Sequence, residues 1–405
     1  SLTTADKLTA GGNIAASSET GNIDLAAAEA NGGIDLKATN GKLTAEALQA
    51  QGSIAAAGKD VEMKNQVIAG KDLTMTAANS LTTADEVSAA ANMTLAGGDV
   101  MTVKKVTAGN DMKMTAANSL TTADEVSAAN ITLAGGDVTT QKKVNAGNKL
   151  TMTATNSLTT ADEVSAANIT LTGGDITTAK TVNARNDLTL TAANSLKAAD
   201  KLTADGNIAA SSANGNIDIT AAEAKGGIDL KAANGKLTAA VLQAQGSIAA
   251  AGKDVEMKTV TAGNDLTMTA ANSLTTADEL SAANITLAGG DVATQKKVTA
   301  GSNLTLKAAN KLTTADKLTA GGNIAASSAN GNIDLAAAEA KGVIDLKATN
   351  GKLTAAVLQA QGSIAAAGKD VAMKTATAGS NLTLTATNSL TTADKLTAGG
   401  NIAAS

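Results

Sequence analysis

The sequence lacks cysteine, proline, histidine, phenylalanine, tryptophan and tyrosine, and its only arginine is Arg185. The absence of cysteine excludes a disulfide scaffold and thiolate chemistry. The absence of every aromatic side chain argues against a globular core in a chain of 405 residues, because aromatic rings are the largest apolar contributors to such cores. The narrow interior of a coiled solenoid, filled by Ile, Leu, Val and Ala, tolerates this loss.

Charge is also sparse: charged residues make up 17% of the chain, and the net charge is −5 at pH 7. This charge is weak, and no basic face is interleaved with aromatic residues, so we predict no nucleic-acid partner. The hydrophobic content of 43% argues against a disordered chain. No apolar run reaches the length of about 20 residues that crosses a bilayer, so we predict no membrane span.

An apolar residue recurs every 18 to 20 residues from one end of the chain to the other. These positions are Ile14, Ile34, Ile54, Leu73, Met93, Met112, Ile131, Leu150, Ile169, Leu188, Ile208, Ile228, Ile248, Leu266, Ile285, Leu304, Ile324, Ile344, Ile364, Leu382 and Ile402. We call them the anchors. A period this short and regular indicates a solenoid of stacked coils, each of which buries its apolar face against its neighbours. We therefore predict one continuous β-helical repeat domain over residues 1–405.

Each coil of this solenoid is predicted to contain three short strands. In the run Leu150–Asn168, Leu150 and Met152 alternate with Thr151 and Thr153, which is the period of a strand with one buried face. Leu158 and Val164 begin two further short extended runs in the same coil.

Glycine, asparagine and aspartate occupy the positions where these extended runs change direction. Examples are Gly135, Gly136 and Asp137, and also Gly147 and Asn148. Because these residue types tolerate a positive φ at little steric cost, we predict that they mark the corners of the coils.

Whole coils are duplicated along the chain. A block that begins at Lys7 returns with few changes at Lys201 and Lys317, and Ser389–Ser405 repeats Ser1–Ser17 letter for letter. Only an architecture of stacked, equivalent coils accepts such duplications without refolding. We expect the chain to be a fragment of a longer array that continues in both directions.

Acidic and basic pairs alternate at one position of successive coils. This predicted charge ladder comprises Asp85, Glu86, Lys104, Lys105, Asp124, Glu125, Lys142, Lys143, Asp278, Glu279, Lys296 and Lys297. Opposite charges would meet on neighbouring coils. A slip of the stack by one coil would place like charges together at every contact, so we predict that the ladder controls the register of the coils. The alternative is that these side chains are merely solvated on an exposed edge. A second predicted ladder, of asparagines at alternate corners, comprises Asn118, Asn156, Asn194 and Asn272 and would satisfy main-chain groups.

The run Ala262–Leu306 opens with glycine-asparagine-aspartate-leucine and has leucine-threonine-threonine in its middle. It resembles the repeats of filamentous haemagglutinin-type exoproteins of bacterial two-partner secretion systems. The resemblance extends over essentially all 405 residues. It implies a right-handed parallel β-helix of about 20 coils, exported through an outer-membrane transporter and displayed outside the cell or on the bacterial surface. Relatives in that family are adhesins and the stalks of contact-dependent inhibition toxins.

We therefore expect a structural role, as the rigid stalk or filament of an adhesin-like exoprotein. One alternative is a fibre or sheath component that assembles end to end or laterally. Another is a module that binds glycans of a host or neighbouring cell through Thr and Asn faces, although MTLAG and ITLAG runs interrupt the Thr ranks in alternate coils. We expect no enzyme activity, cofactor or metal, and the expected partners are further repeats or copies of the same fibre.

Overall fold

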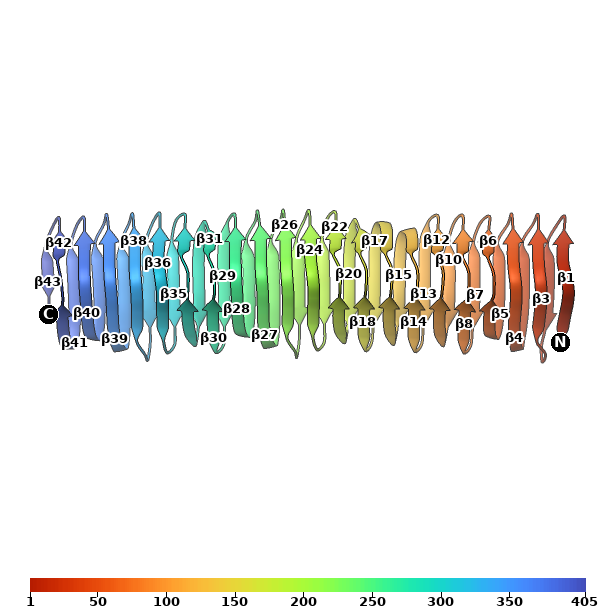
Figure 1. The fold of residues 1–405 in the computed structure, drawn as a ribbon, viewed down its shortest axis with the longest axis horizontal. Coiled ribbons are helices and arrows are strands. Elements are labelled where there is room, and N and C mark those ends of the chain that lie inside the picture. Colours follow the sequence, from red (N-terminus) through yellow and green to blue (C-terminus); the bar gives the residue numbers. More distant parts are fainter. The chain divides into compact units, whose positions relative to one another are not determined.

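The computed structural model describes all 405 residues and consists of β-strands without a helix. Residues 1–193 and 197–204 form a first unit, and residues 194–196 and 205–405 form a second. Each unit is a stack of parallel coils, and the chain makes about 20 turns in all (Figure 1). The predicted all-β solenoid of parallel coils is confirmed.

The strands of the first unit are β1 (Leu2–Ala10), β2 (Ile14–Ser18), β3 (Ile23–Ala30), β4 (Ile34–Ala50), β5 (Ile54–Met63), β6 (Val67–Ala69), β7 (Leu73–Ala77), β8 (Ser80–Thr83), β9 (Val87–Ala89), β10 (Met93–Gly97), β11 (Asp99–Thr102), β12 (Val106–Ala108), β13 (Asp111–Ala116), β14 (Ser119–Thr122), β15 (Val126–Gly135), β16 (Asp137–Thr140), β17 (Val144–Ala154), β18 (Ser157–Thr160), β19 (Val164–Ala166), β20 (Asn168–Gly173), β21 (Asp175–Thr178), β22 (Val182–Ala184), β23 (Leu188–Ala192) and β24 (Leu196–Ala204), whose first residue belongs to the second unit.

The strands of the second unit are β25 (Ile208–Ser212), β26 (Ile217–Ala224), β27 (Ile228–Ala244), β28 (Ile248–Ala262), β29 (Asp265–Ala270), β30 (Ser273–Thr276), β31 (Leu280–Ala282), β32 (Asn284–Gly289), β33 (Asp291–Thr294), β34 (Val298–Ala300), β35 (Leu304–Ala308), β36 (Leu312–Ala320), β37 (Ile324–Ser328), β38 (Ile333–Ala340), β39 (Ile344–Ala360), β40 (Ile364–Ala378), β41 (Leu382–Thr392), β42 (Leu396–Ala398) and β43 (Ile402–Ala404).

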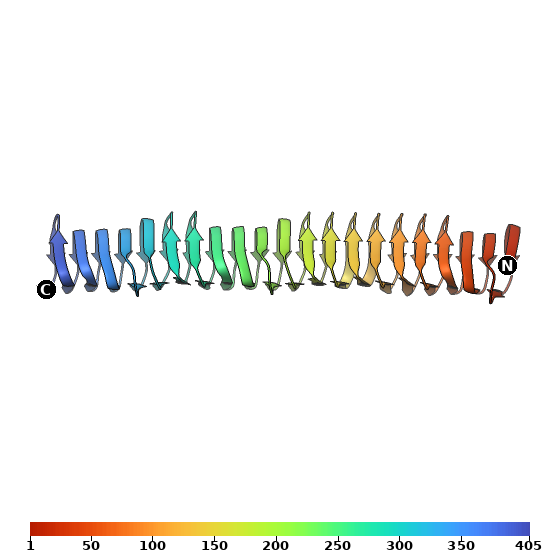
Figure 2. The same cartoon turned by 90° about the horizontal axis from the view of Figure 1, so that it is seen from below.

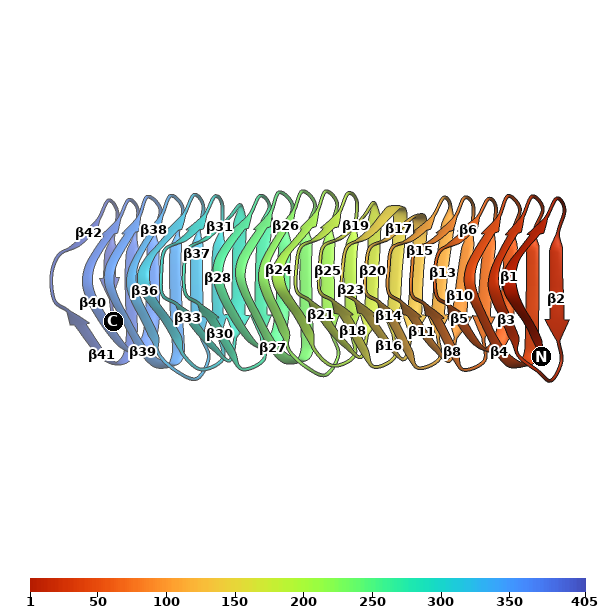
Figure 3. The ribbon, with the colours of Figure 1, turned by 45° about the vertical axis from the view of Figure 1, so that its right-hand side comes forward.

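The alternation of apolar and polar residues gives each strand one buried face. In β17, Leu150 and Met152 are fully buried, whereas Thr151 and Thr153 lie on the outside. Leu158 and Val164 are buried in β18 and β19, so the predicted three strands of this coil are confirmed. Figure 3 shows how the chain turns through such strands before the next coil begins.

The anchors set the register of the stack. Within each unit every anchor pairs with the next one, from Ile14 with Ile34 in the first unit to Leu382 with Ile402 in the second. Strands of the same face consequently lie side by side, coil after coil (Figure 2). From Ile34 to Leu382 the anchors are at most 2% exposed, so they form the apolar core of each unit.

The corners of the coils form without a left-handed main-chain conformation. No residue, glycine or other, has a positive φ. Gly136 is required because of a close approach: a Cβ there would overlap the carbonyl oxygen of Asn118 in the preceding coil and lie 3.2 Å from that of Ala117. A Cβ on Gly147 would lie no closer than 3.5 Å to any atom of the neighbouring coil, which is ordinary contact. Some corner glycines thus allow coils to stack closely, rather than letting the main chain turn.

A column of threonines lies inside the stack, in an interior that we expected Ile, Leu, Val and Ala to fill. Thr102, Thr122 and Thr140 pair in register on consecutive levels and are fully buried. The column comprises Thr83, Thr102, Thr122, Thr140, Thr160 and Thr178 in the first unit and Thr276, Thr294 and Thr314 in the second. Their hydroxyl groups have no hydrogen-bond partner. Burying an unpartnered hydroxyl destabilises a fold, so the column weakens each unit.

Replacing one of these buried threonines by the isosteric valine should therefore stabilise the protein. We expect Thr122→Val to raise the free energy of unfolding by about 1 kcal/mol, measured by chemical denaturation. The matched control is Thr121→Val, because Thr121 is the adjacent residue and its side chain lies on the outside of the same strand. The control should change stability by less than about 0.5 kcal/mol. Equal effects of the two substitutions would show that Thr122 is not buried without a partner.

Candidate functional site: polar ladders on the coil edges

The predicted charge ladder lies where each coil enters its third strand. The N–H groups of Val87, Val106 and Val126 donate to the carbonyl oxygens of Lys105, Glu125 and Lys143, at 2.9 to 3.0 Å. These three carbonyls belong to consecutive coils. The main chain thus places basic and acidic residues alternately, one coil apart, along this edge of the first unit. In the second unit, the N–H groups of Val260 and Leu280 donate to the carbonyl oxygens of Glu279 and Lys297 in the same way.

Only some of the ladder side chains form ion pairs. Lys105 Nζ lies 3.9 Å from Glu125 Oε2. Lys143 Nζ lies 2.7 Å from the carboxylate of Glu163, a residue outside the predicted set, which raises the pKa of Lys143 through a hydrogen bond and the opposite charge. Both pairs are about half exposed, and solvent screens the attraction between exposed charges. These ion pairs therefore add little to stability, and control of the register by the ladder stays a prediction.

The other predicted ladder residues have different neighbours. Asp85 and Asp124 each accept the N–H of the following glutamate at 2.8 Å, which closes the turn ahead of the third strand. Lys104 and Lys142 are exposed. Asp278, Glu279, Lys296 and Lys297 occupy the equivalent positions in the second unit, where the ladder relies on the main-chain register.

The asparagines of the second predicted ladder join their corners to both neighbouring coils. Asn118 donates its N–H to the carbonyl of Gly98 and accepts the N–H of Asp137, both at 2.7 Å. Asn156 and Asn272 make the corresponding main-chain contacts, and the carbonyl of Asn194 accepts the N–H of Gly215. Asn118 and Asn156 thus each lie between a glycine of the preceding coil and an aspartate of the following coil.

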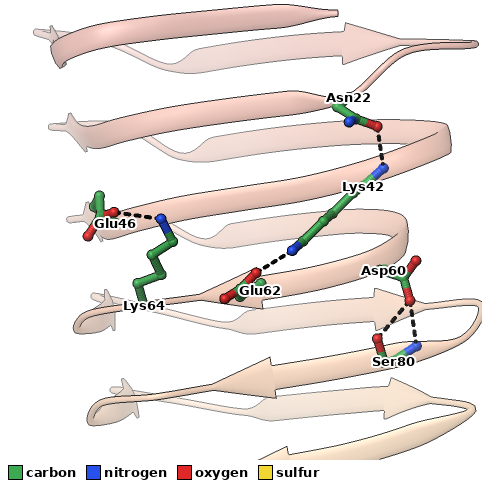
Figure 4. A network of polar contacts seen from close by, with 7 residues as sticks. All are labelled: Asn22, Lys42, Glu46, Asp60, Glu62, Lys64 and Ser80. Atoms are coloured by element: carbon green, nitrogen blue, oxygen red, sulfur yellow. Dashed lines mark hydrogen bonds and ion pairs between the residues drawn. The ribbon is translucent and has the colours of Figure 1, made fainter.

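At these corners a serine hydroxyl and main-chain N–H bind the carboxylate of an aspartate in the preceding coil. We did not predict this contact from the sequence. Asp137 accepts the hydroxyl of Ser157 at 2.5 Å and the N–H of the same serine at 3.1 Å. Figure 4 shows the equivalent contact of Asp60 with Ser80. We call this arrangement the carboxylate clamp. Its members are Asp60 with Ser80, Asp99 with Ser119, Asp137 with Ser157, Asp254 with Ser273, and Asp370 with Ser389.

The clamp stabilises the ionised form of its aspartate. The hydroxyl of Ser157 is the main cause that holds the pKa of Asp137 below its ordinary value of 3.8. Burial opposes this change, while the N–H of Ser157 and the side chain of Asn156 support it. Asn118 and Asn272 act in the same way on Asp99 and Asp254, so three of the predicted asparagines are part of a clamp.

We expect the clamp to add stability that depends on pH. Because the pKa of Asp137 is lowered in the folded state, its contribution is present above pH 3.8 and is lost as the pH falls through the folded-state pKa. Ser157→Ala should therefore destabilise the protein at neutral pH, and the difference from the native chain should shrink below pH 3.8. Thermal unfolding at a series of pH values measures this.

The matched control for that experiment is Ser165→Ala. The hydroxyl of Ser165 donates to the uncharged side chain of Asn145 at 3.1 Å, also between successive coils. Its removal should change stability by an amount that does not vary with acidification. A pH-independent effect of Ser157→Ala would contradict the clamp.

A further polar network crosses the first block of the chain (Figure 4). Lys64 Nζ lies 2.9 Å from Glu46, and Lys42 is paired with Glu62. The side chain of Asn22 accepts the N–H of Lys42 at 2.9 Å. Every one of these contacts joins residues of neighbouring coils, so these polar side chains hold one coil to the next.

The surface depressions are shallow and do not gather reactive groups. One of about 300 Å³ is lined by Leu335, Ala336, Ala356, Met373 and neighbouring residues of the third block. No three Asp or Glu side chains converge to form a group that could hold a metal ion. The structure contains no helix of the length and apolarity needed to span a membrane. The polar side chains described above contact one another rather than line a pocket.

Comparison with known proteins adds no family to these observations. No protein-family model matches the chain. No curated protein matches it in sequence either.

Proposed function

We propose that the chain is a structural segment of an extracellular bacterial fibre, in which it acts as a rigid stalk or filament. The single observation that carries this proposal is the unbroken main-chain register, in which each anchor within a unit pairs with the next. A stack of this kind tolerates added or lost coils, so its length can vary without a change of fold. Polar side chains such as Ser157, Lys64 and Lys143 join one coil to the next, which supports a mechanical role.

The resemblance to filamentous haemagglutinin-type repeats supports export by two-partner secretion. We expect the gene next to the coding sequence to encode an outer-membrane transporter. Display on the bacterial surface would follow, and labelling of intact cells with an antibody against the chain measures it. Retention of the chain inside intact cells would contradict this part of the proposal.

A glycan-binding module is the second candidate, because one outward threonine rank is more continuous than the sequence suggested. Thr132, Thr151, Thr170 and Thr189 pair on consecutive levels of the first unit. The neighbouring rank is interrupted by Ala134, which lies between Thr115 and Thr153.

A glycan-array experiment separates the two candidates. A spacer should show no saturable binding with either the native chain or the variant Thr151→Ala. A binding module should show saturable binding that weakens in Thr151→Ala and is kept in Thr139→Ala, which alters another face. Saturable binding of the native chain would overturn the purely structural role.

A further inference from the structure

One position on the side of the stack differs between the three repeated blocks of the chain. It is Ala47 in the first block, Val241 in the second and Val357 in the third. Both valines are 44% exposed, and each pairs with an alanine of the preceding coil. The two valine side chains therefore project from the surface, and we call them the knobs.

In the first block the same part of the surface is a hollow of about 150 Å³. Ala27 and Ala47 pair on neighbouring coils and line this hollow, and Ile68 adds an apolar wall. The residues that take the place of Ile68 in the other two blocks are Thr261 and Thr377. Cavities of about 150 Å³ bind molecules as large as benzene, so the hollow has room for a valine side chain.

The hollow and the knobs lie on the side of the stack, with coils before and after each of them. Lys7 borders the hollow in a preceding coil, and Gln66 borders it in the following coil. Val357 pairs with Ala337 of the preceding coil and with Thr375 of the following coil. Further coils at either end of the chain would leave both features unchanged.

We propose that the knobs and the hollow join two copies of the chain side by side. Val241 or Val357 of one copy enters the hollow over Ala27 and Ala47 of the other copy. An apolar side chain that fits a pocket elsewhere on the same molecule makes a contact that does not close on itself, so further copies can be added. This inference rests on the proposed fibre function and specifies the lateral contact between such fibres.

Charge favours a knob in the hollow over contact between two knobs. Beside the hollow, Lys64 is paired with Glu46. Beside the knobs, the equivalent lysines are Lys258 and Lys374, and alanine replaces the glutamate, so these lysines lack that partner. Two knobs in contact would bring the unpaired lysines together. A knob in the hollow instead brings one of them towards the exposed carboxylates of Glu29 and Glu46.

The first test fills the hollow. Ala47→Val introduces the residue that the second and third blocks already carry at this position, so the coil should keep its fold. We expect the native chain to associate as its concentration rises, and we expect Ala47→Val to weaken this association about 10-fold, because the apolar contact is lost. Sedimentation velocity over a concentration series measures it, and circular dichroism checks the fold.

The matched control removes a different exposed valine. Val343 is 39% exposed and lies immediately before β39, the strand that contains Val357. Val343→Ala should leave association unchanged. Weakening by Val343→Ala to the same extent as by Ala47→Val would overturn the proposal, since association would then follow exposed apolar surface in general.

The second test exchanges the knobs and the hollow. Val241→Ala together with Val357→Ala removes both knobs and should weaken association as strongly as filling the hollow does. Adding Ala47→Val to that chain creates a knob in the first block and leaves alanine at the former knob positions. Association should then recover at least in part. Absence of any recovery would overturn the proposal.

These outcomes are separable from those that test the fibre function. A native chain that stays monomeric at every concentration, or an Ala47→Val chain that associates like the native chain, overturns the lateral contact and leaves a stalk role intact. Saturable glycan binding, in contrast, would overturn the purely structural role without affecting the association results.

Discussion

Deleting the two coils Met112–Lys149 should leave a folded solenoid, whereas deleting the single coil Met112–Asn130 should lower its stability. Both deletions keep the anchors in step, because Met93 then pairs with Leu150 or with Ile131. They differ in the polar groups that they bring together. Thermal unfolding followed by circular dichroism should show a midpoint close to that of the native chain for the two-coil deletion and a midpoint lower by several degrees for the one-coil deletion.

The difference arises from the alternation of coil types. After the two-coil deletion, Asp99 meets Ser157 in place of Ser119, and Lys105 meets Glu163 in place of Glu125, so each contact keeps its chemistry. After the one-coil deletion, Asp99 meets Asp137. Like charges then face each other on neighbouring strands.

A deletion of ten residues, Met112–Thr121, is the matched disruptive control. It removes about half a coil, including most of β13, so the apolar residues of β15 cannot take the place of β13 opposite β10. We expect loss of the cooperative unfolding transition, because every later strand of the unit would have to find a new register. Similar stability of all three deletions would contradict the stacked register.

Replacing Gly136 by alanine should destabilise the protein by about 1 to 3 kcal/mol, the range typical of overpacking. The new Cβ would overlap the carbonyl oxygen of Asn118, which accepts the N–H of Asp137 at 2.7 Å. Neither group can move without lengthening that hydrogen bond between coils. Chemical denaturation of the variant measures the loss.

The control for that substitution lies in the same coil. Gly147→Ala places a Cβ at ordinary contact distance, and neither glycine has a positive φ. It should leave stability unchanged or raise it by about 0.4 to 1 kcal/mol, because alanine restricts the unfolded chain. Equal destabilisation by the two substitutions would indicate that the corners need glycine for its conformation.

The fold could be predicted from the sequence because the same pattern recurs in every coil. The anchors repeat at nearly the same spacing, so a coil whose own sequence is ambiguous can be assigned from the coils on either side. The alternation of Leu150 and Met152 with threonine identified the buried face of the strand. The role of the corner glycines was not evident from the sequence. Glycine at position 136 is compatible with a positive φ and with a close approach, and only the position of Asn118 in the preceding coil distinguishes the two.

The polar contacts between coils could not be predicted from the sequence, because they depend on which residues of successive coils lie opposite each other. Asp137 and Ser157 are 20 residues apart, and pairing them requires the coil length to within one residue. Thr122 lies two residues after the buried Leu120, so strand periodicity alone favoured burial, yet its hydroxyl argued for the surface. Packing of the stack overrides that preference, and the hydroxyl stays without a partner.

X-ray diffraction from oriented films of the protein tests the stacking of parallel coils most directly. We expect a strong reflection near 4.8 Å along the direction in which the coils stack, because each coil is hydrogen-bonded to the next through its main chain. A pattern without that reflection, or with the rise of about 1.5 Å per residue that marks α-helices, would contradict it.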